Sequence, residues 1–441
     1  MKLISLFDGI GCFPLAWAYA NKIDYKELEY DSSEIMPFLC SVIKENFPKS
    51  NQLFNIEEVN YKTLSGDIIT MGTPCTGFSL SGKRDGLQNI ESKLFENGVE
   101  AIKEVQPKYF VWENVYGVLS ANKGLEFRAI LDEFKKIGYD VIWTTYDSQF
   151  FTVPHRRRRI YMIGVRDGIP KNHNIFSFFN RSSSSLIKKT KELAKFREFD
   201  FNKESQSPTE HYAIFNRQRS DTFKEIGLSS TLAKRDYKSF MDLVVKNGSL
   251  RRIVPKERLR LQGIPDNWFD CTYEDYKTDK PRFQANGMTV PVVQHVFENL
   301  LGIENGNLLG DEFEDNMAEI INSNKSHYYI DKTSTNIYFK KNSEFKNMPT
   351  SGQVRLKRDK NGKVTSDNAE YLLIEHLAES SDEIKISDIQ DYLLDKVEDK
   401  FHISEGGCDG ILRREAESGL PLPQKLKEVI LYKYPSLKEK Y

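Results

Sequence analysis

The stretch LISLFDGIGC, residues 3–12, decides how this chain is expected to fold. Its first half is apolar and β-favouring and predicts a strand over residues 3–7, and an apolar helix is expected to begin near Cys12. Asp8, Gly9 and Gly11 lie in the turn between them. Glycine lets the backbone of such a turn approach a ligand closely, and the amides that open the helix favour an anionic group. The stretch therefore predicts the first strand, turn and helix of an α/β fold with a ligand at the turn.

The first 165 residues continue the same rhythm. Short β-branched or aromatic runs alternate with stretches of helical period at residues 36–46 and 125–137. This alternation is typical of a doubly wound, mostly parallel sheet, in which ligands bind at the carboxyl ends of the strands. The expected strands are residues 3–7, 68–71, 109–112, 141–146 and 160–165.

The alternation ends near Gly168. Residues 168–250 are polar and rich in Ser and Lys, which predicts a small, irregular second domain. Order returns within residues 251–301. The remaining residues, 302–441, begin with an acidic linker and are expected to form several helices from residue 367 onward.

Charge is distributed unevenly along the chain although the net charge is only -1. Residues 151–260 hold 25 Lys+Arg and 11 Asp+Glu, a net of +14, so the other residues carry -15. Clustered Arg and Lys contact phosphates, which makes nucleic acid the natural partner, with a solvated loop-rich region as the alternative. Residues 302–441 have a net charge of -6 and are a poor generic DNA arm. We expect a helical accessory region there that packs on the main domain or pairs with another copy.

The bulk composition excludes several classes of protein. Hydrophobic residues make up 39% and charged residues 29%, and no apolar run approaches the roughly 18 residues of a membrane helix. The five scattered cysteines form no CxxC pair, so we expect neither a disulfide framework nor a metal site. A reducing cytoplasm is the expected compartment.

Two polar residues follow neighbouring strands of the expected sheet. Cys75 lies in the loop 72–79 after the strand 68–71, and Glu113 follows the strand 109–112. Because the carboxyl ends of parallel strands meet at one rim, both side chains are expected there. A loop cysteine at such a rim is suited to nucleophilic chemistry, although a lone cysteine is more commonly a small buried residue.

Two further patterns suggest ligand contacts. Glu34 lies about 20 residues beyond the glycine turn, where a carboxylate can hold ribose hydroxyls, and Ile35 can pack on an adenine face; a surface Glu after a tight turn is the alternative. Residues 154–159 read Pro-His-Arg-Arg-Arg-Arg. In an extended segment Arg157 and Arg159 share one face, so this pair can point into the crevice.

In their order along the chain, these motifs resemble those of the cytosine-5 DNA methyltransferase family. The matching segments are 7–11 (cofactor loop), 34–35 (ribose and adenine contacts), 72–79 (catalytic motif), 113–115 (glutamate motif), 155–159 (Gln-x-Arg-x-Arg motif), 258–266 (motif after the recognition domain) and 286–290 (closing motif). Details at 81–87, 232–237 and 410–414 are closest to phage-borne and prophage members.

The resemblance implies a fold, a domain order and a reaction. The fold is the S-adenosylmethionine-dependent, Rossmann-like α/β type, with a catalytic cofactor-binding domain over 1–167 and a target-recognition region over 168–250. Late motifs over 251–301 return to the catalytic domain, and 302–441 form an accessory C-terminal region. The reaction moves a methyl group from S-adenosylmethionine to C5 of a cytosine flipped out of a specific sequence in double-stranded DNA.

The resemblance also assigns residue roles. Cys75 forms a covalent adduct with C6 of the cytosine, Glu113 bonds N3, Arg159 holds O2 and Arg157 orders the catalytic loop. The residues implied to bind the cofactor are Phe7, Asp8, Gly9, Ile10, Gly11, Glu34, Ile35, Asn55, Ile56, Thr73, Pro74, Asn286 and Gly287.

The chain departs from the family pattern at a few positions. Thr76 and His155 replace Gln, Cys12 and Ala285 replace Gly, and residues 54–56 read Phe-Asn-Ile where the family has Gly-Asp-Ile. An Asn55 side-chain oxygen can still accept a hydrogen bond from the adenine amino group.

Two other functions stay open: a transfer-RNA cytosine-5 methyltransferase and a non-enzymatic DNA-binding relative. We expect no membrane partner. The cytoplasm of a bacterial or phage-infected cell is the expected location. A role in restriction-modification and a phage role fit the sequence equally, and the C-terminal region is a candidate for self-association.

Overall fold

A computed structural model describes two compact units of the chain. The described residues are 1–73, 90–168, 213–216, 223–225, 227–232, 242–270, 287–304, 328–331, 348, 350–358, 364–374, 387 and 389–441. Unit 1 comprises Met1–Asp147, Arg158–Lys188 and Val292–Ile384. Unit 2 comprises Ser148–Arg157, Lys189–Pro291 and Lys385–Tyr441.

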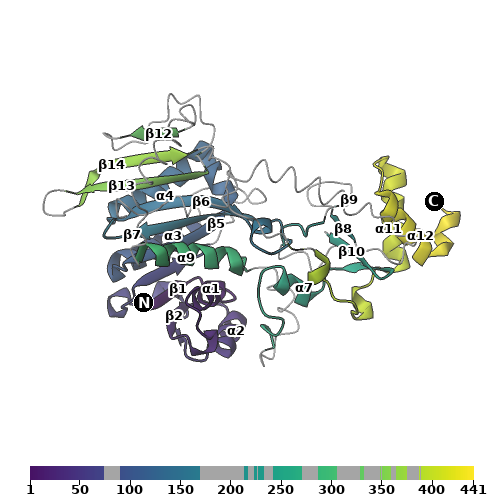
Figure 1. The fold of residues 1–441 in the computed structure, drawn as a ribbon, viewed down its shortest axis with the longest axis horizontal. Coiled ribbons are helices and arrows are strands. Elements are labelled where there is room, and N and C mark those ends of the chain that lie inside the picture. The colour runs from purple at the N-terminus through teal and green to yellow at the C-terminus, as the bar shows by residue number, and fades with distance from the viewer. Residues whose placement is uncertain are drawn as a thin grey trace. The chain divides into compact units, whose positions relative to one another are not determined.

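A ten-stranded sheet forms the centre of unit 1, in the order β12-β14-β13-β6-β7-β5-β4-β1-β2-β3 (Figure 1). Within this order, the strands β5, β4, β1, β2 and β3 pair in parallel. The strands β7 and β6 and the three C-terminal strands, β12 to β14, pair antiparallel. The strands are β1 (Leu3–Leu6), β2 (Tyr30–Ser33), β3 (Asn51–Gln52), β4 (Ile68–Met71), β5 (Tyr109–Val115), β6 (Asp140–Asp147), β7 (Arg158–Val165), β12 (Tyr328–Asp331), β13 (Ser351–Arg358) and β14 (Val364–Ile374).

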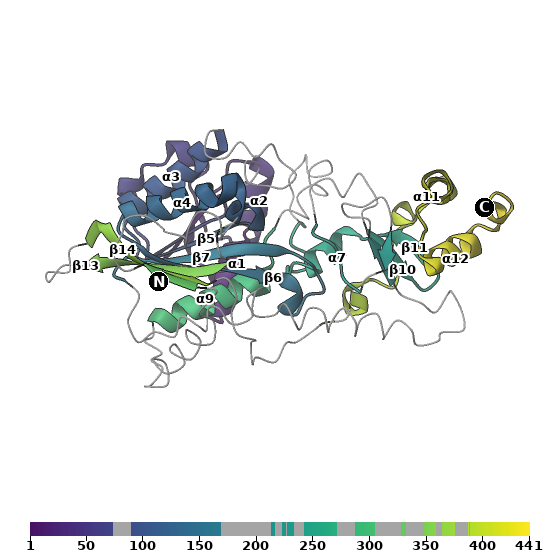
Figure 2. The same cartoon turned by 90° about the horizontal axis from the view of Figure 1, so that it is seen from above.

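Helices cover both faces of this sheet. Figure 2 shows α3 (Ile90–Val105) and α4 (Leu125–Lys136) on one face and α9 (Val290–Glu304) on the other. The ring of Phe297 in α9 meets Trp17 of α1 (Cys12–Ala20) edge-on, with 5.1 Å between ring centroids. The helix α2 (Pro37–Asn46) follows β2. Helices on both faces of a sheet with a parallel half confirm the predicted doubly wound α/β fold.

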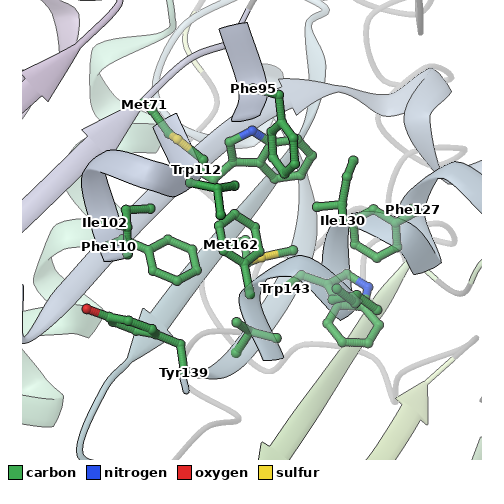
Figure 3. Packing of buried hydrophobic residues seen from close by; sticks show 14 of the residues in the cluster. Met71, Phe95, Ile102, Phe110, Trp112, Phe127, Ile130, Tyr139, Trp143 and Met162 are labelled. Atoms are coloured by element: carbon green, nitrogen blue, oxygen red, sulfur yellow. The ribbon is translucent and has the colours of Figure 1, made fainter. Parts of the chain in front are cut away.

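The main core of unit 1 lies between the sheet and the helices α3 and α4. Alternate strand residues point to this face, among them Phe110 and Trp112 of β5 and Trp143 of β6 (Figure 3). The ring of Phe110 stacks on Phe134 of α4 with 4.3 Å between centroids. The packing is tight at Gly164 in β7, where a Cβ would lie 1.9 Å from the ring of Phe110.

The tail contributes strands to unit 1 as well as helices to unit 2. β13 pairs antiparallel with β6, so that Gly352 lies opposite Trp143, and β14 pairs with β13. The backbone N–H of Leu356 donates to the Asp140 carboxylate at 2.9 Å. The expectation of helices from residue 367 onward was therefore wrong for residues 367–374, which lie in β14. Pairing with a strand already in the sheet decides the conformation there, because β preference depends on neighbours more than on local sequence.

Unit 2 contains a four-stranded antiparallel sheet in the order β11-β10-β8-β9. The strands are β8 (Ala213–Asn216), β9 (Lys224–Glu225), β10 (Asp242–Lys246) and β11 (Ser249–Arg252), and the helices are α7 (Pro255–Arg260), α11 (Glu405–Ser418) and α12 (Gln424–Lys433). Asn247 and Gly248 join β10 to β11 with φ of 51° and 70°, as a two-residue hairpin turn requires.

The C-terminal helices complete the core of unit 2. Leu243 and Leu250 of the sheet share one buried apolar cluster with Leu412 of α11 and Ile430 of α12. No described helix combines the length and the apolar character that a membrane span requires.

A buried ion pair links the sheet of unit 2 to the C-terminal segment. The Arg251 guanidinium donates to both carboxylate oxygens of Glu257 at 2.9 and 2.7 Å, and these residues are 1% and 0% exposed. The same guanidinium donates to the Leu394 carbonyl, and the Leu394 N–H donates to the Glu257 carboxylate. The pair is therefore hydrogen-bonded on both sides, as a buried charge pair must be.

Candidate active site

The turn after β1 brings backbone amides to the carboxyl edge of the parallel strands. Phe7, Gly9 and Gly11 adopt left-handed backbone, with φ of 55°, 59° and 79°. Gly11 immediately precedes α1 and, having no side chain, does not itself cap the first amides of that helix. The first turn of α1 is therefore suited to an anionic group, as the sequence predicted.

Asp8 lies beneath this turn. Its carboxylate is only 2% exposed and accepts hydrogen bonds from Ser5 Oγ at 2.7 Å and from Tyr30 Oη and Ser32 Oγ at 2.8 Å each. Burial raises the pKa of Asp8 from 3.8 to about 6, although the three hydroxyl groups oppose the rise and nearby Glu34 adds to it. Through these hydrogen bonds Asp8 connects the turn to β1 and β2.

Glu34 lies at the end of β2 beside the turn. One carboxylate oxygen accepts from the Gly9 N–H and the other from the Met36 N–H, both at 2.9 Å. The next side chain, Ile35, is 65% exposed. The structure therefore places the predicted ribose-binding carboxylate and the predicted adenine-facing residue next to the glycine turn.

The segment 54–56 follows β3, the strand that pairs with β2. Asn55 uses its side chain to cap the 3₁₀ helix Ile56–Glu58: Oδ1 accepts from the Glu57 N–H at 3.1 Å and Nδ2 donates to Glu58 at 3.0 Å. An amide oxygen has two lone pairs, so the cap leaves room for a second donor. Ile56 is 5% exposed and belongs to the core of unit 1.

Glu113 and Arg159 meet at the carboxyl end of β5. The Arg159 Nε atom lies 3.3 Å from a Glu113 carboxylate oxygen, and their side chains are 16% and 10% exposed. β7 runs antiparallel to β5 with Arg159 opposite Val115, and this pairing brings the arginine to the glutamate. Arg158 lies over the ring of Tyr116, 3.9 Å from its centroid.

Thr73 anchors the start of the loop that follows β4. Its hydroxyl accepts from Trp112 Nε1 and from Asn114 Nδ2, each at 3.1 Å. Trp112 and Asn114 flank Glu113 in β5, so the loop leaves the sheet next to this part of β5, while the Glu113 side chain points to the opposite face. No role was predicted for these two residues, although Asn114 lies inside the glutamate motif.

Three predicted residues lie outside the described residues: Pro74, Cys75 and Asn286. Gly287 and Arg157 belong to unit 2. Arg157 is 9% exposed, and its carbonyl accepts from the N–H and the hydroxyl of Ser148 at 3.1 Å each.

His155, which stands where the family has Gln, is fully buried in unit 2. Its Nδ1 lies 3.1 Å from the Leu261 carbonyl, and its Nε2 lies 3.3 Å from the Leu232 N–H. This pattern assigns the neutral ring, with the proton on Nδ1 and Nε2 as acceptor. His155 thereby fixes the backbone ahead of the arginine run.

The comparisons with known proteins decide the family. Residues 1–302 match the model of the C-5 cytosine-specific DNA methylases. The chain belongs to this family. Type II methyltransferase M.NgoBI of Neisseria gonorrhoeae is 30% identical over 304 residues, which cover 66% of this chain and 90% of that relative.

Two further relatives match different lengths of the chain. Type II methyltransferase M1.ScrFI of Lactococcus lactis subsp. cremoris is 28% identical over 68% of this chain and 78% of its own length. Orphan methyltransferase M.SPRI of Bacillus phage SPR is 32% identical over 185 residues, which span 41% of each protein. The chain is thus similar both to bacterial type II methyltransferases and to an orphan methyltransferase of a phage.

Family membership confirms the predicted activity. The C-5 methylase is a DNA (cytosine-5-)-methyltransferase that takes its methyl group from S-adenosylmethionine and acts on DNA. The glycine turn fits this cofactor, because the amides of α1 suit its carboxylate and the oriented Glu34 carboxylate suits its ribose hydroxyls.

Proposed function

We propose that the C-5 methylase uses Cys75 as the nucleophile on a flipped-out cytosine and that Glu113 and Arg159 hold the polar edge of the base. The observation that supports this most is the 3.3 Å contact between Arg159 and Glu113 beside the Thr73 anchor. Cys75 follows Thr73 by two positions, so the anchor limits how far the thiol can lie from this edge.

The chemistry explains why a thiol, a carboxyl group and a guanidinium are needed together. C5 of cytosine is a poor nucleophile, and a bond from the Cys75 sulfur to C6 converts the ring into an enamine that is rich in electrons at C5. The addition places negative charge on N3 and O2. Glu113 can donate a proton or share one at N3, and Arg159 can donate to O2.

Product forms when the ring regains its aromaticity. S-Adenosylmethionine, when bound, would supply an electrophilic methyl carbon to C5 and keep the electrons of the broken bond between sulfur and methyl, which leaves S-adenosylhomocysteine. The C5 proton leaves to a base or to water, and the bond between C6 and Cys75 breaks with return of its electrons to sulfur. Arg157 is proposed to order the catalytic loop.

The cofactor is proposed to lie across the carboxyl ends of β1 and β2. The turn at residues 7–11 would hold its methionine part, Glu34 its ribose, and Ile35 with residues 55–56 its adenine. Thr73, Pro74, Asn286 and Gly287 are the further proposed contacts.

Double-stranded DNA is the proposed substrate, and the basic region is proposed to bind it. The net charge of +14 over residues 151–260 suits phosphate contacts, and side chains within 168–250 would read base edges. The proposed location is the cytoplasm of a bacterial or phage-infected cell. Self-association through residues 302–441 stays a prediction, and light scattering of the purified protein tests it.

One labelling experiment tests the acceptor. The protein is incubated with tritiated S-adenosylmethionine and either duplex DNA or transfer RNA, and methylated cytosines are mapped by sequencing. We expect label in DNA at one short sequence. Label in RNA alone would support a transfer-RNA enzyme, and DNA binding without label would support a non-enzymatic relative.

A trapping experiment tests the nucleophile. Duplex DNA with 5-fluorocytosine at the mapped site should form a denaturation-resistant adduct with the protein. Cys75→Ser should abolish the adduct, whereas Cys271→Ser, a change outside every motif, should retain it. An adduct that survives Cys75→Ser contradicts the assignment.

A further inference from the structure

Phe54 is an exposed aromatic residue in a backbone conformation that favours glycine. Its φ is 56° and its exposed fraction is 57%. A left-handed conformation is unfavourable for a residue with a Cβ, and an exposed ring gains little from packing within its own chain. The family pattern has glycine at this position, so the chain keeps the glycine conformation but adds a ring there.

Hydrogen bonds on both sides fix the backbone of Phe54. The Leu53 N–H donates to the Ser32 carbonyl at 2.7 Å, and the Ser33 hydroxyl donates to the Phe54 carbonyl at 2.8 Å. Asn55 then caps the 3₁₀ helix that follows. The conformation is therefore imposed by the surrounding strands.

The strand register places Phe54 next to Glu34. β2 and β3 are parallel, with Ser32 opposite Gln52, and the Ser33 hydroxyl bonds the Phe54 carbonyl, so Phe54 lies at the end of β2, where Glu34 is the next residue. Ile35, the next residue, is 65% exposed. Two large apolar side chains thus lie exposed at the ends of adjacent strands, near a carboxylate that is bonded to the glycine turn.

An adenosine group suits this arrangement. Its ribose hydroxyls can donate to Glu34, and its flat base can cover apolar side chains. An aromatic ring also stacks on a purine face. Neighbouring exposed apolar side chains typically mark a binding site.

We propose that Phe54 is an adenine-binding residue of the C-5 methylase, which covers the adenine of S-adenosylmethionine together with Ile35. The proposal rests on the proposed placement of the ribose on Glu34. It adds an aromatic contact at a position where the family pattern has no side chain.

Calorimetric binding of S-adenosylhomocysteine without DNA tests the proposal. Phe54→Gly should weaken binding at least tenfold, while the unliganded protein should melt no lower than wild type because glycine accepts the left-handed backbone. Phe54→Asn, a second residue that tolerates this backbone, should show the same loss. Tyr432→Ala, which removes an aromatic residue of the same 57% exposure from α12, should bind as wild type.

The Glu34→Gln variant distinguishes the role of Phe54 from the placement of the cofactor ribose on Glu34. Wild-type affinity in both Phe54 variants, with weakened binding in Glu34→Gln, would overturn the role of Phe54 and leave the cofactor placement standing. Wild-type affinity in all three variants would overturn the placement itself. If the Phe54→Gly protein melts at a lower temperature than wild type, the affinity of the Phe54→Asn protein for S-adenosylhomocysteine decides whether Phe54 binds the adenine.

Discussion

Replacing Asp8 by Asn should change how the stability of the C-5 methylase depends on pH. The Asp8 carboxylate is buried beneath the glycine turn, and burial raises its pKa to about 6. A folded-state pKa above the ordinary 3.8 means that the folded protein binds this proton more tightly than the unfolded chain does. The stabilisation is complete below pH 3.8 and is lost as the pH rises through about 6.

The size of the effect follows from the two pKa values. A change from 3.8 to about 6 corresponds to about 3 kcal/mol between the protonated and the ionised form. About 2 kcal/mol of this falls between about pH 4.5 and pH 7, where both states can be measured. The Asp8→Asn variant has no titrating proton at this position and therefore lacks this contribution.

Urea unfolding of wild type and Asp8→Asn at a series of pH values measures the effect. Other groups titrate in both proteins, so they cancel when one free energy of unfolding is subtracted from the other. We expect wild type to lose about 2 kcal/mol relative to the variant between about pH 4.5 and pH 7. Ser32→Ala, which removes one hydroxyl donor, should move the loss to higher pH.

A difference between the two proteins that stays constant with pH would show that folding does not raise the pKa of Asp8. Asp8 would then ionise in the folded protein as it does in the unfolded chain, and the three hydroxyl groups would fully offset the effect of burial. A pH-independent offset added to the expected change is compatible with the reasoning, because Asn and Asp differ in hydrogen bonding at every pH.

Three further substitutions test the packing of the core, the buried ion pair and the hydrogen bond that anchors Thr73. Gly164→Ala should lower the free energy of unfolding by about 1–3 kcal/mol in thermal melts, since its Cβ would overlap a core ring. Glu257→Gln leaves Arg251 buried without its counter-charge and should lower it by about 3–5 kcal/mol in urea titrations. Asn114→Ala removes a donor to Thr73, so single-turnover methylation should slow about tenfold or more; unchanged turnover would contradict the anchoring role.

The local pattern of the first 165 residues predicted most of the elements there, although not β2, β3 or α3. The strand expected at residues 141–146 is β6 (Asp140–Asp147), and the helix expected at 125–137 is α4 (Leu125–Lys136). These elements form between neighbours in sequence, where periodicity carries the information. The addition of β13 to β6 joins residues about 210 positions apart, and no local pattern encodes such a pairing.

In the candidate active site, too, local sequence predicted some features and long-range contacts determined the others. Glu113 was expected at the rim because it follows the strand predicted at residues 109–112, but β5 continues to Val115, so Glu113 lies inside the strand, two residues before its end. The position of Asp8 under the turn was not foreseen, because it depends on hydroxyl groups from two strands that meet only in the folded sheet. Arg159 reaches Glu113 through the antiparallel pairing of β7 with β5, which the expectation of a mostly parallel sheet did not include.

The closure of unit 2 by its C-terminal helices has a consequence for synthesis. The sheet residue Leu250 leaves the ribosome long before Leu426 of α12, which packs in the same cluster. At about 5–20 residues per second the interval is roughly 9–35 s. During that time the apolar face of the nascent sheet lacks its cover, so a prematurely terminated chain would expose a surface that chaperones and proteases recognise.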